Sequence, residues 1–147
     1  MSRVLYSNVV CTNIVDHICF QMRCNLVKYI IATKTLISVL IDESISLGKL
    51  SCLIVYMIIT LSDDIGPVTL FLDIVELQCT SADGTEAALE TCLTKLRFTN
   101  EFLNECWLGI GIDGCSTMLG IKAGVDTRLK SKFPMLVSWY CLNHRLE

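Results

Sequence analysis

Hydrophobic residues recur at every fourth position near the start of the chain. The residues of this repeat are Val10, Ile14, Ile18, Met22, Leu26 and Ile30. This spacing is close to the 3.6-residue period of an α-helix, so the apolar side chains should gather on one face. We therefore predict a long amphipathic helix over residues 6–32, and we treat residues 1–34 as an N-terminal helical segment.

Three runs of strand-forming residues follow this helix, at residues 35–41, 51–60 and 68–77. The gaps between the runs contain glycine, aspartate and a Gly-Pro pair, which are typical of turns. Because such short gaps cannot hold a crossover helix, the three strands should form an antiparallel meander. The longest uncharged apolar stretch, residues 50–61, is shorter than the roughly 20 residues that span a membrane as a helix, which favours a buried strand.

The second half of the chain alternates between helical and strand patterns. Helices are predicted from about residue 85 to 100, at 101–105 and around 122–132, and strands at 107–112 and 135–141. A helix separates the last two strands, so they can lie parallel to each other and to the first strand. The predicted fold is α/β, with a mixed sheet of five strands, an N-terminal helix and flanking helices.

Composition and charge narrow the class of protein. The chain has 147 residues, enough for one domain, and its 52% hydrophobic and 18% charged residues exclude a disordered protein. The formal net charge of -3 creates no overall positive field for nucleic acid, so any DNA contact must be local. Nine cysteines without regular spacing, together with no secretory signal pattern, predict reduced thiols in an intracellular protein.

Two of the predicted strands end in aspartate. Asp42 is followed by Glu43, and Asp113 is followed by Gly114 and, two residues later, Ser116. Carboxylates at strand ends are typical ligands of Mg²⁺ or Mn²⁺ in phosphoryl-transfer enzymes. If the two strands are neighbours, Asp42 and Asp113 can share a divalent cation. Glu43 would support the pair or face solvent, while Gly114 and Ser116 would permit the turn that exposes Asp113.

Three motifs give the chain a resemblance to a known family. They are LIDESIS at residues 40–46, IDGCSTMLG at 112–120 with GVDTRL at 124–129, and WYCLNHRLE at 139–147. In this order and spacing they resemble the catalytic domain of hAT-type DNA transposases, especially the vertebrate genes derived from them. The resemblance implies a nuclear protein with an RNase H-like domain over residues 35–147, in which the first and fourth strands are neighbours.

The same resemblance assigns roles to the two aspartates. It makes Asp42 and Asp113 the first two acidic residues of a catalytic triad that uses Mg²⁺ or Mn²⁺ in two-metal phosphoryl transfer. The family's third acid, a glutamate, lies beyond a large helical insertion, and this chain stops at Glu147 before that point. We therefore expect a C-terminally truncated, catalytically incomplete domain with a vestigial pair of acids. Without a helix to close the sheet after the last strand, apolar surface should be exposed.

A Cys-x-x-His motif lies near the end of the chain, at Cys141 and His144. A structural zinc site usually needs four ligands, and no second pair stands at matching spacing. Metal binding by Cys141 and His144 is therefore one alternative. The favoured alternative is packing and hydrogen bonding beside the carboxylates, with Trp139 nearby.

Three functions remain open from the sequence. The first is a nuclear DNA- or protein-interaction domain derived from a transposase, with DNA contact inherited but weak in this segment. The second is a SUMO-protein ligase-type role or a protein-interaction adaptor, because some relatives carry that name, although no RING-type cysteine and histidine pairing is present. The third is metal-dependent DNA strand transfer or cleavage, if a longer form supplies the third acid. Protein partners or an oligomer would form through the missing regions, and no membrane contact is expected.

Overall fold

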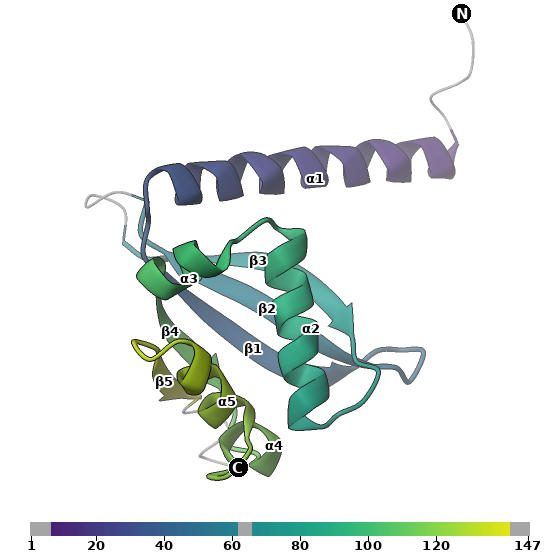
Figure 1. Cartoon of the computed structure of the whole chain (residues 1–147). Coiled ribbons are helices and arrows are strands. Elements are labelled where there is room, and N and C mark those ends of the chain that lie inside the picture. Colours follow the sequence, from purple (N-terminus) through teal and green to yellow (C-terminus); the bar gives the residue numbers. More distant parts are fainter. Residues whose placement is uncertain (1–6, 62–65, 142–147) are drawn as a thin grey trace, which may run out of the picture.

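A computed structural model describes residues 7–61 and 66–141, which form a mixed sheet of five strands with helices packed against it (Figure 1). The elements are α1 (Asn8–Ala32), β1 (Ile37–Ile45), β2 (Ser51–Ile59), β3 (Val68–Glu76), α2 (Ala82–Lys95), α3 (Asn100–Cys106), β4 (Trp107–Ile112), α4 (Ser116–Leu119), α5 (Val125–Lys132) and β5 (Val137–Tyr140). The α/β class predicted from the sequence is confirmed.

The strands lie in the order β3-β2-β1-β4-β5. β1, β2 and β3 pair antiparallel, as the short turns between them predict. β4 pairs parallel with both β1 and β5, so the predicted parallel arrangement of the first, fourth and fifth strands is also confirmed. This layout is consistent with an RNase H-like fold. It also makes β1 and β4 neighbours, which a shared site at their ends requires.

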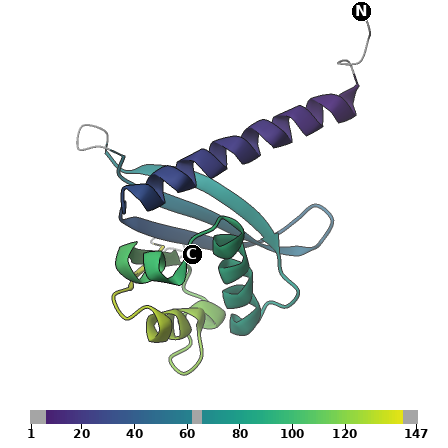
Figure 2. The same cartoon turned by 45° about the horizontal axis from the view of Figure 1, so that its top comes forward.

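The two faces of the sheet have different surroundings. On β1, Ile37, Val39 and Ile41 are buried, whereas Leu40 is half-buried and Asp42 is exposed. Because successive side chains of a strand point to opposite faces, the first three define a helix-covered face and the other two an open face. Figure 2 shows α2, α3 and α5 together on one side of the sheet.

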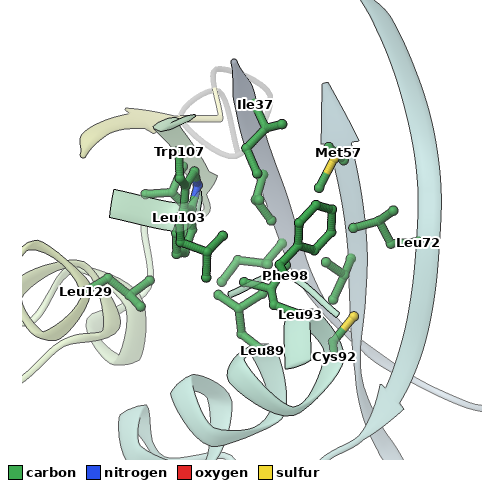
Figure 3. Close-up of a cluster of buried hydrophobic side chains, with 14 of the residues drawn as sticks. Ile37, Met57, Leu72, Leu89, Cys92, Leu93, Phe98, Leu103, Trp107 and Leu129 are labelled. Atoms are coloured by element: carbon green, nitrogen blue, oxygen red, sulfur yellow. The ribbon is translucent and has the colours of Figure 1, made fainter. Parts of the chain in front are cut away.

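The hydrophobic core fills the space between the sheet and the helices on the helix-covered face. Figure 3 shows Leu89 and Leu93 of α2 gathered with Ile37 of β1 and Met57 of β2, all of them fully or almost fully buried. Trp107, the first residue of β4, is also buried, and its ring lies 5.0 Å from that of Phe133. This packing fixes the start of β4 against the helices, and it therefore positions the residues that follow the strand.

Apolar side chains also cover much of the open face, where strand alternation and register place them together. They are Leu40, Ile54, Tyr56, Ile58, Phe71, Ile74, Val137 and Trp139. Several are well exposed, including Ile74 at 54% and Trp139 at 73%. The exposed apolar surface that we expected from the sequence is therefore present.

The first helix differs from its prediction. We expected the four-residue repeat to form one apolar face of an amphipathic helix, yet its members differ in burial: Ile14, Ile18 and Met22 are exposed, whereas Ile30 is buried together with Val27, which is not part of the repeat. The reason is geometric: a strict step of four residues advances about 40° beyond a full helical turn. The repeat therefore winds around the helix, and only its C-terminal end reaches the core.

The first strand is longer than predicted. β1 continues to Ile45, and Asp42 and Glu43 pair with Ile54 and Leu53 of β2. Asp42 is therefore inside the strand and not at its end. β4 ends at Ile112 as predicted, so Asp113 directly follows its strand. Along residues 7–61 and 66–141, the structure contains no helix that is long and apolar enough to span a membrane.

Candidate metal-binding carboxylates

The register of the parallel strands brings Asp42 and Asp113 together. The last paired residues of β1 and β4 are Leu40 and Gly111; Asp42 lies two residues beyond Leu40 within β1, and Asp113 lies two residues beyond Gly111, directly after the end of β4. Neighbouring strands are about 4.8 Å apart, so the two residues occupy adjacent backbone positions. A step of two residues keeps Asp42 on the open face with Leu40. The neighbour relation that the sequence analysis required is therefore present.

The two aspartates have different surroundings. Asp42 is exposed, whereas Asp113 is half-buried and its Oδ1 accepts a hydrogen bond of 3.1 Å from the backbone N–H of Cys115. This local bond fixes the Asp113 side chain at the start of the turn. Partial burial raises the pKa of the Cys115 thiol, and its hydrogen bond with Asp113 raises that pKa further.

Glu43 belongs to the other face of the sheet. Its Oε1 accepts a hydrogen bond of 2.9 Å from Oγ1 of Thr85, which is fully buried in the first turn of α2. Glu43 therefore anchors α2 to β1. Its support for the carboxylate pair is indirect, because it holds the strand that carries Asp42.

The turn after Asp113 does not depend on a glycine. A Cβ atom at Gly114 would meet no atom within 4 Å, and Gly114 does not have the left-handed backbone that favours glycine. Glycine is therefore not required at position 114 for the turn that follows Asp113. Ser116 is exposed and begins the short helix α4.

Trp139 and Cys141 extend the site along β5. Trp139 pairs with Gly111 of β4, and the backbone N–H of Cys141 donates to the carbonyl of Ile112 at 3.0 Å. Cys141 therefore lies beside Asp113, while its motif partner His144 lies outside the described residues. Among the residues that the structure describes, no group of three or more histidine, cysteine or acidic side chains is placed to hold a metal ion. Zinc binding by Cys141 and His144 remains a prediction.

One feature near the pair was not identified from the sequence. An apolar groove of about 360 Å³ runs over β4 on the open face, between Leu40 of β1 and Trp139 of β5. It exists because Gly109 and Gly111 have no side chains, and a Cβ on Gly111 would come within 2.2 Å of Cδ2 of Leu40. Alternating glycines inside a strand mark such a close approach. The Gly-Ile-Gly sequence was therefore the signal that could have revealed the groove.

The arrangement fits a weakly held hard cation. Two adjacent carboxylates offer the oxygen ligands that Mg²⁺ and Mn²⁺ prefer, and the exposure of Asp42 leaves room for the water molecules that complete their coordination.

Comparison of the sequence with known proteins does not assign the chain to a family. No model of a known protein family matches the sequence, and no curated protein matches it significantly. The likeness to hAT transposases therefore remains a prediction that rests on the three motifs.

Proposed function

We propose that this chain is a transposase-derived, RNase H-like domain that acts in the nucleus as an interaction module and not as a nuclease. In this proposal, Asp42 and Asp113 are retained from a two-metal phosphoryl-transfer site. The observation that supports the proposal is the parallel pairing of β1 with β4, whose last pair, Leu40 and Gly111, lies two residues before Asp42 and Asp113. The family motifs around them support the assignment.

Asp42 and Asp113 are the residues that would hold Mg²⁺ or Mn²⁺. Such an ion, when bound, polarises a phosphoryl oxygen and stabilises a leaving oxygen. The chain's own contribution is to orient the two carboxylates: β1 carries Asp42, and the Cys115 N–H holds Asp113. Two protein ligands leave most of the coordination shell to water, which favours weak binding. This is the basis for a domain that binds the ion without cleaving DNA.

A cleavage assay tests the proposed lack of nuclease activity. Labelled double- and single-stranded DNA would be incubated with the purified chain and Mn²⁺, beside the variants Asp42→Asn and Asp113→Asn. We expect no cleavage above the background shared by all three proteins. Metal-dependent cleavage that disappears in both variants would refute the proposal and favour the strand-transfer alternative.

The nature of the surface favours a protein partner over DNA. The net charge of -3 gives DNA no general attraction, whereas the open face presents a contiguous apolar surface that includes Trp139, Val137 and Ile74. We expect a fluorescent fusion of the chain to accumulate in the nucleus, and we expect the purified chain to bind DNA weakly at physiological salt. Exclusion from the nucleus would contradict the proposed location.

The SUMO-ligase role stays a prediction from the names of some members of the family that the motifs resemble, and no contact among residues 7–61 and 66–141 favours it. A conjugation assay with purified components tests it directly. We expect the chain to leave the rate of SUMO transfer unchanged. A rate of SUMO transfer that increases when the chain is added would contradict the proposed interaction module and favour the SUMO-ligase function.

A further inference from the structure

The long helix α1 carries apolar side chains on the side that faces solvent. Val15 is 57% exposed, Ile18 51%, Met22 67% and Tyr29 46%. In Figure 1 and Figure 2, α1 extends well beyond the sheet, with its N-terminal half away from the other elements. These side chains are therefore not part of the core that the described residues form.

These residues belong to a regular stripe, which we name the heptad stripe. It consists of Cys11, Val15, Ile18, Met22, Asn25 and Tyr29, all of them exposed. The steps between them alternate between four and three residues. This spacing is the a/d pattern of a coiled coil, in which the seam of one helix faces the seam of another. Unlike the four-residue repeat, it stays on one side of the helix.

The heptad stripe lies opposite the side by which α1 attaches to the sheet. Val27 and Ile30 pack into the core, and Nη1 of Arg23 donates to the carbonyl of Leu72 at 2.7 Å. Ile18 precedes Val27 by nine residues, which corresponds to about 180° around a helix. A second helix can therefore approach the stripe without meeting the part of the chain that the structure describes.

A second copy of the same helix is the partner that fits the stripe. The positions that flank the seam carry no charge before Lys28; they are Thr12, Ile14, Cys19, Gln21 and Leu26, the last of which is partly buried against the core. Two copies can therefore meet without repulsion, and apolar Ile14 adds to the contact area. The spacing makes Asn25 a d position, and in a parallel pair the d position of one helix faces the d position of the other, so the two Asn25 side chains would meet each other and not an apolar residue.

We propose that α1 pairs through the heptad stripe with α1 of a second copy, as a parallel two-helix coiled coil that makes the chain a dimer. The α1 helix has 25 residues, or a length of about 37 Å, which allows three heptads of contact. The inference is independent of the carboxylate pair. It assigns a role to the residues of α1 that the fold leaves exposed.

The mass of the full chain in solution tests the proposal. Sedimentation or light scattering should give a dimer for the wild-type chain and a monomer for Ile18→Glu, whose charge lies in the seam. Val9→Glu is the matched control, because Val9 is 68% exposed on the same helix but outside the stripe. It should remain a dimer. A monomeric wild type, a dimeric Ile18→Glu or a monomeric Val9→Glu would each overturn the proposal.

Two further measurements keep the result interpretable. The tryptophan fluorescence, which comes from buried Trp107 and exposed Trp139, should be the same in all three proteins, since neither residue belongs to α1. Mild oxidation should link two copies through Cys11, which a parallel pair brings together. This cross-link should disappear in Cys11→Ser and persist in Cys19→Ser. A dimer that does not cross-link through Cys11 would overturn the parallel arrangement.

Discussion

The two faces of the sheet place neighbouring acidic residues of β1 in opposite environments. Glu43 points to the helix-covered face, where buried Thr85 donates a hydrogen bond to it. Asp42 precedes it in the same strand and is exposed on the open face, next to Asp113. One strand therefore has two environments: Ile37, Val39 and Ile41 are buried on the helix-covered face, while Leu40 and Asp42 lie on the open face.

The alternation of a strand produces this division, and the rest of the sheet extends it. Leu53 of β2 is fully buried under the helices, whereas Ile74 of β3 lies on the open face and is 54% exposed. Substitutions on the two faces should therefore differ clearly in how much they lower the free energy of unfolding. Substitutions on the helix-covered face should change stability, and those on the open face should change binding.

The largest expected loss of stability comes from a substitution on the helix-covered face. Leu53→Ala should lower the free energy of unfolding by about 2–5 kcal/mol, because it removes buried methyl groups and leaves a cavity. Ile74→Ala on the open face is the matched control and should cost about 0.5–1 kcal/mol. Urea denaturation followed by tryptophan fluorescence measures both. Equal losses would mean that the open face is also part of the core.

The next largest expected effect is a loss of stability at alkaline pH. Burial raises the pKa of the Cys92 thiol to about 11 from its ordinary value of 9.0. The unfolded chain therefore loses this proton near pH 9, while the folded chain keeps it until about pH 11. Stability should be complete below pH 9 and fall by about 2–3 kcal/mol as the pH rises through this window.

Urea denaturation at pH 8 and pH 11 checks this fall against Cys92→Ala, which lacks the buried thiol. The variant should lose clearly less stability between the two pH values than the wild type. An equal loss in both proteins would show that Cys92 is not the group responsible.

The smallest effects compare the two neighbouring acids. Thr85→Val removes the hydroxyl that holds Glu43 and should cost about 1–3 kcal/mol, since a half-buried carboxylate oxygen loses its donor. Asp42→Asn should change stability by no more than about 0.5 kcal/mol, as expected for an exposed side chain. Thermal and urea unfolding would measure both variants. A loss in Asp42→Asn as large as that in Thr85→Val would contradict the division between the faces.

Local patterns predicted the sheet well. The short turns around β2 required antiparallel pairing, and the helices before β5 allowed parallel strands, both of which the structure contains. The adjacency of β1 and β4 was implied only by the resemblance, because no local pattern specifies which strands pair across a crossover. The end of β1 was missed for a similar reason, since its last residues are ordered by pairing with β2.

The candidate site was predictable in its residue types but not in its surroundings. Asp42 and Asp113 could be chosen because each follows an apolar run. The hydrogen bond between Glu43 and Thr85 joins residues 42 positions apart, and a one-dimensional pattern does not contain such a contact. The four-residue repeat was wrongly predicted to stay on one face of α1. A four-residue repeat and a heptad repeat differ by a small angle at each step, and this difference accumulates along the helix.

We propose that Asp42 and Asp113 together hold a divalent cation on the open face. Titration of the isotope-labelled chain with Mn²⁺, followed by NMR line broadening, tests it most directly. We predict selective broadening of the amides around Asp42, Asp113 and Gly114 at low Mn²⁺, lost in Asp42→Asn and in Asp113→Asn but kept in Glu43→Gln. Broadening that is absent, or that is unchanged in the two aspartate variants, would contradict the claim.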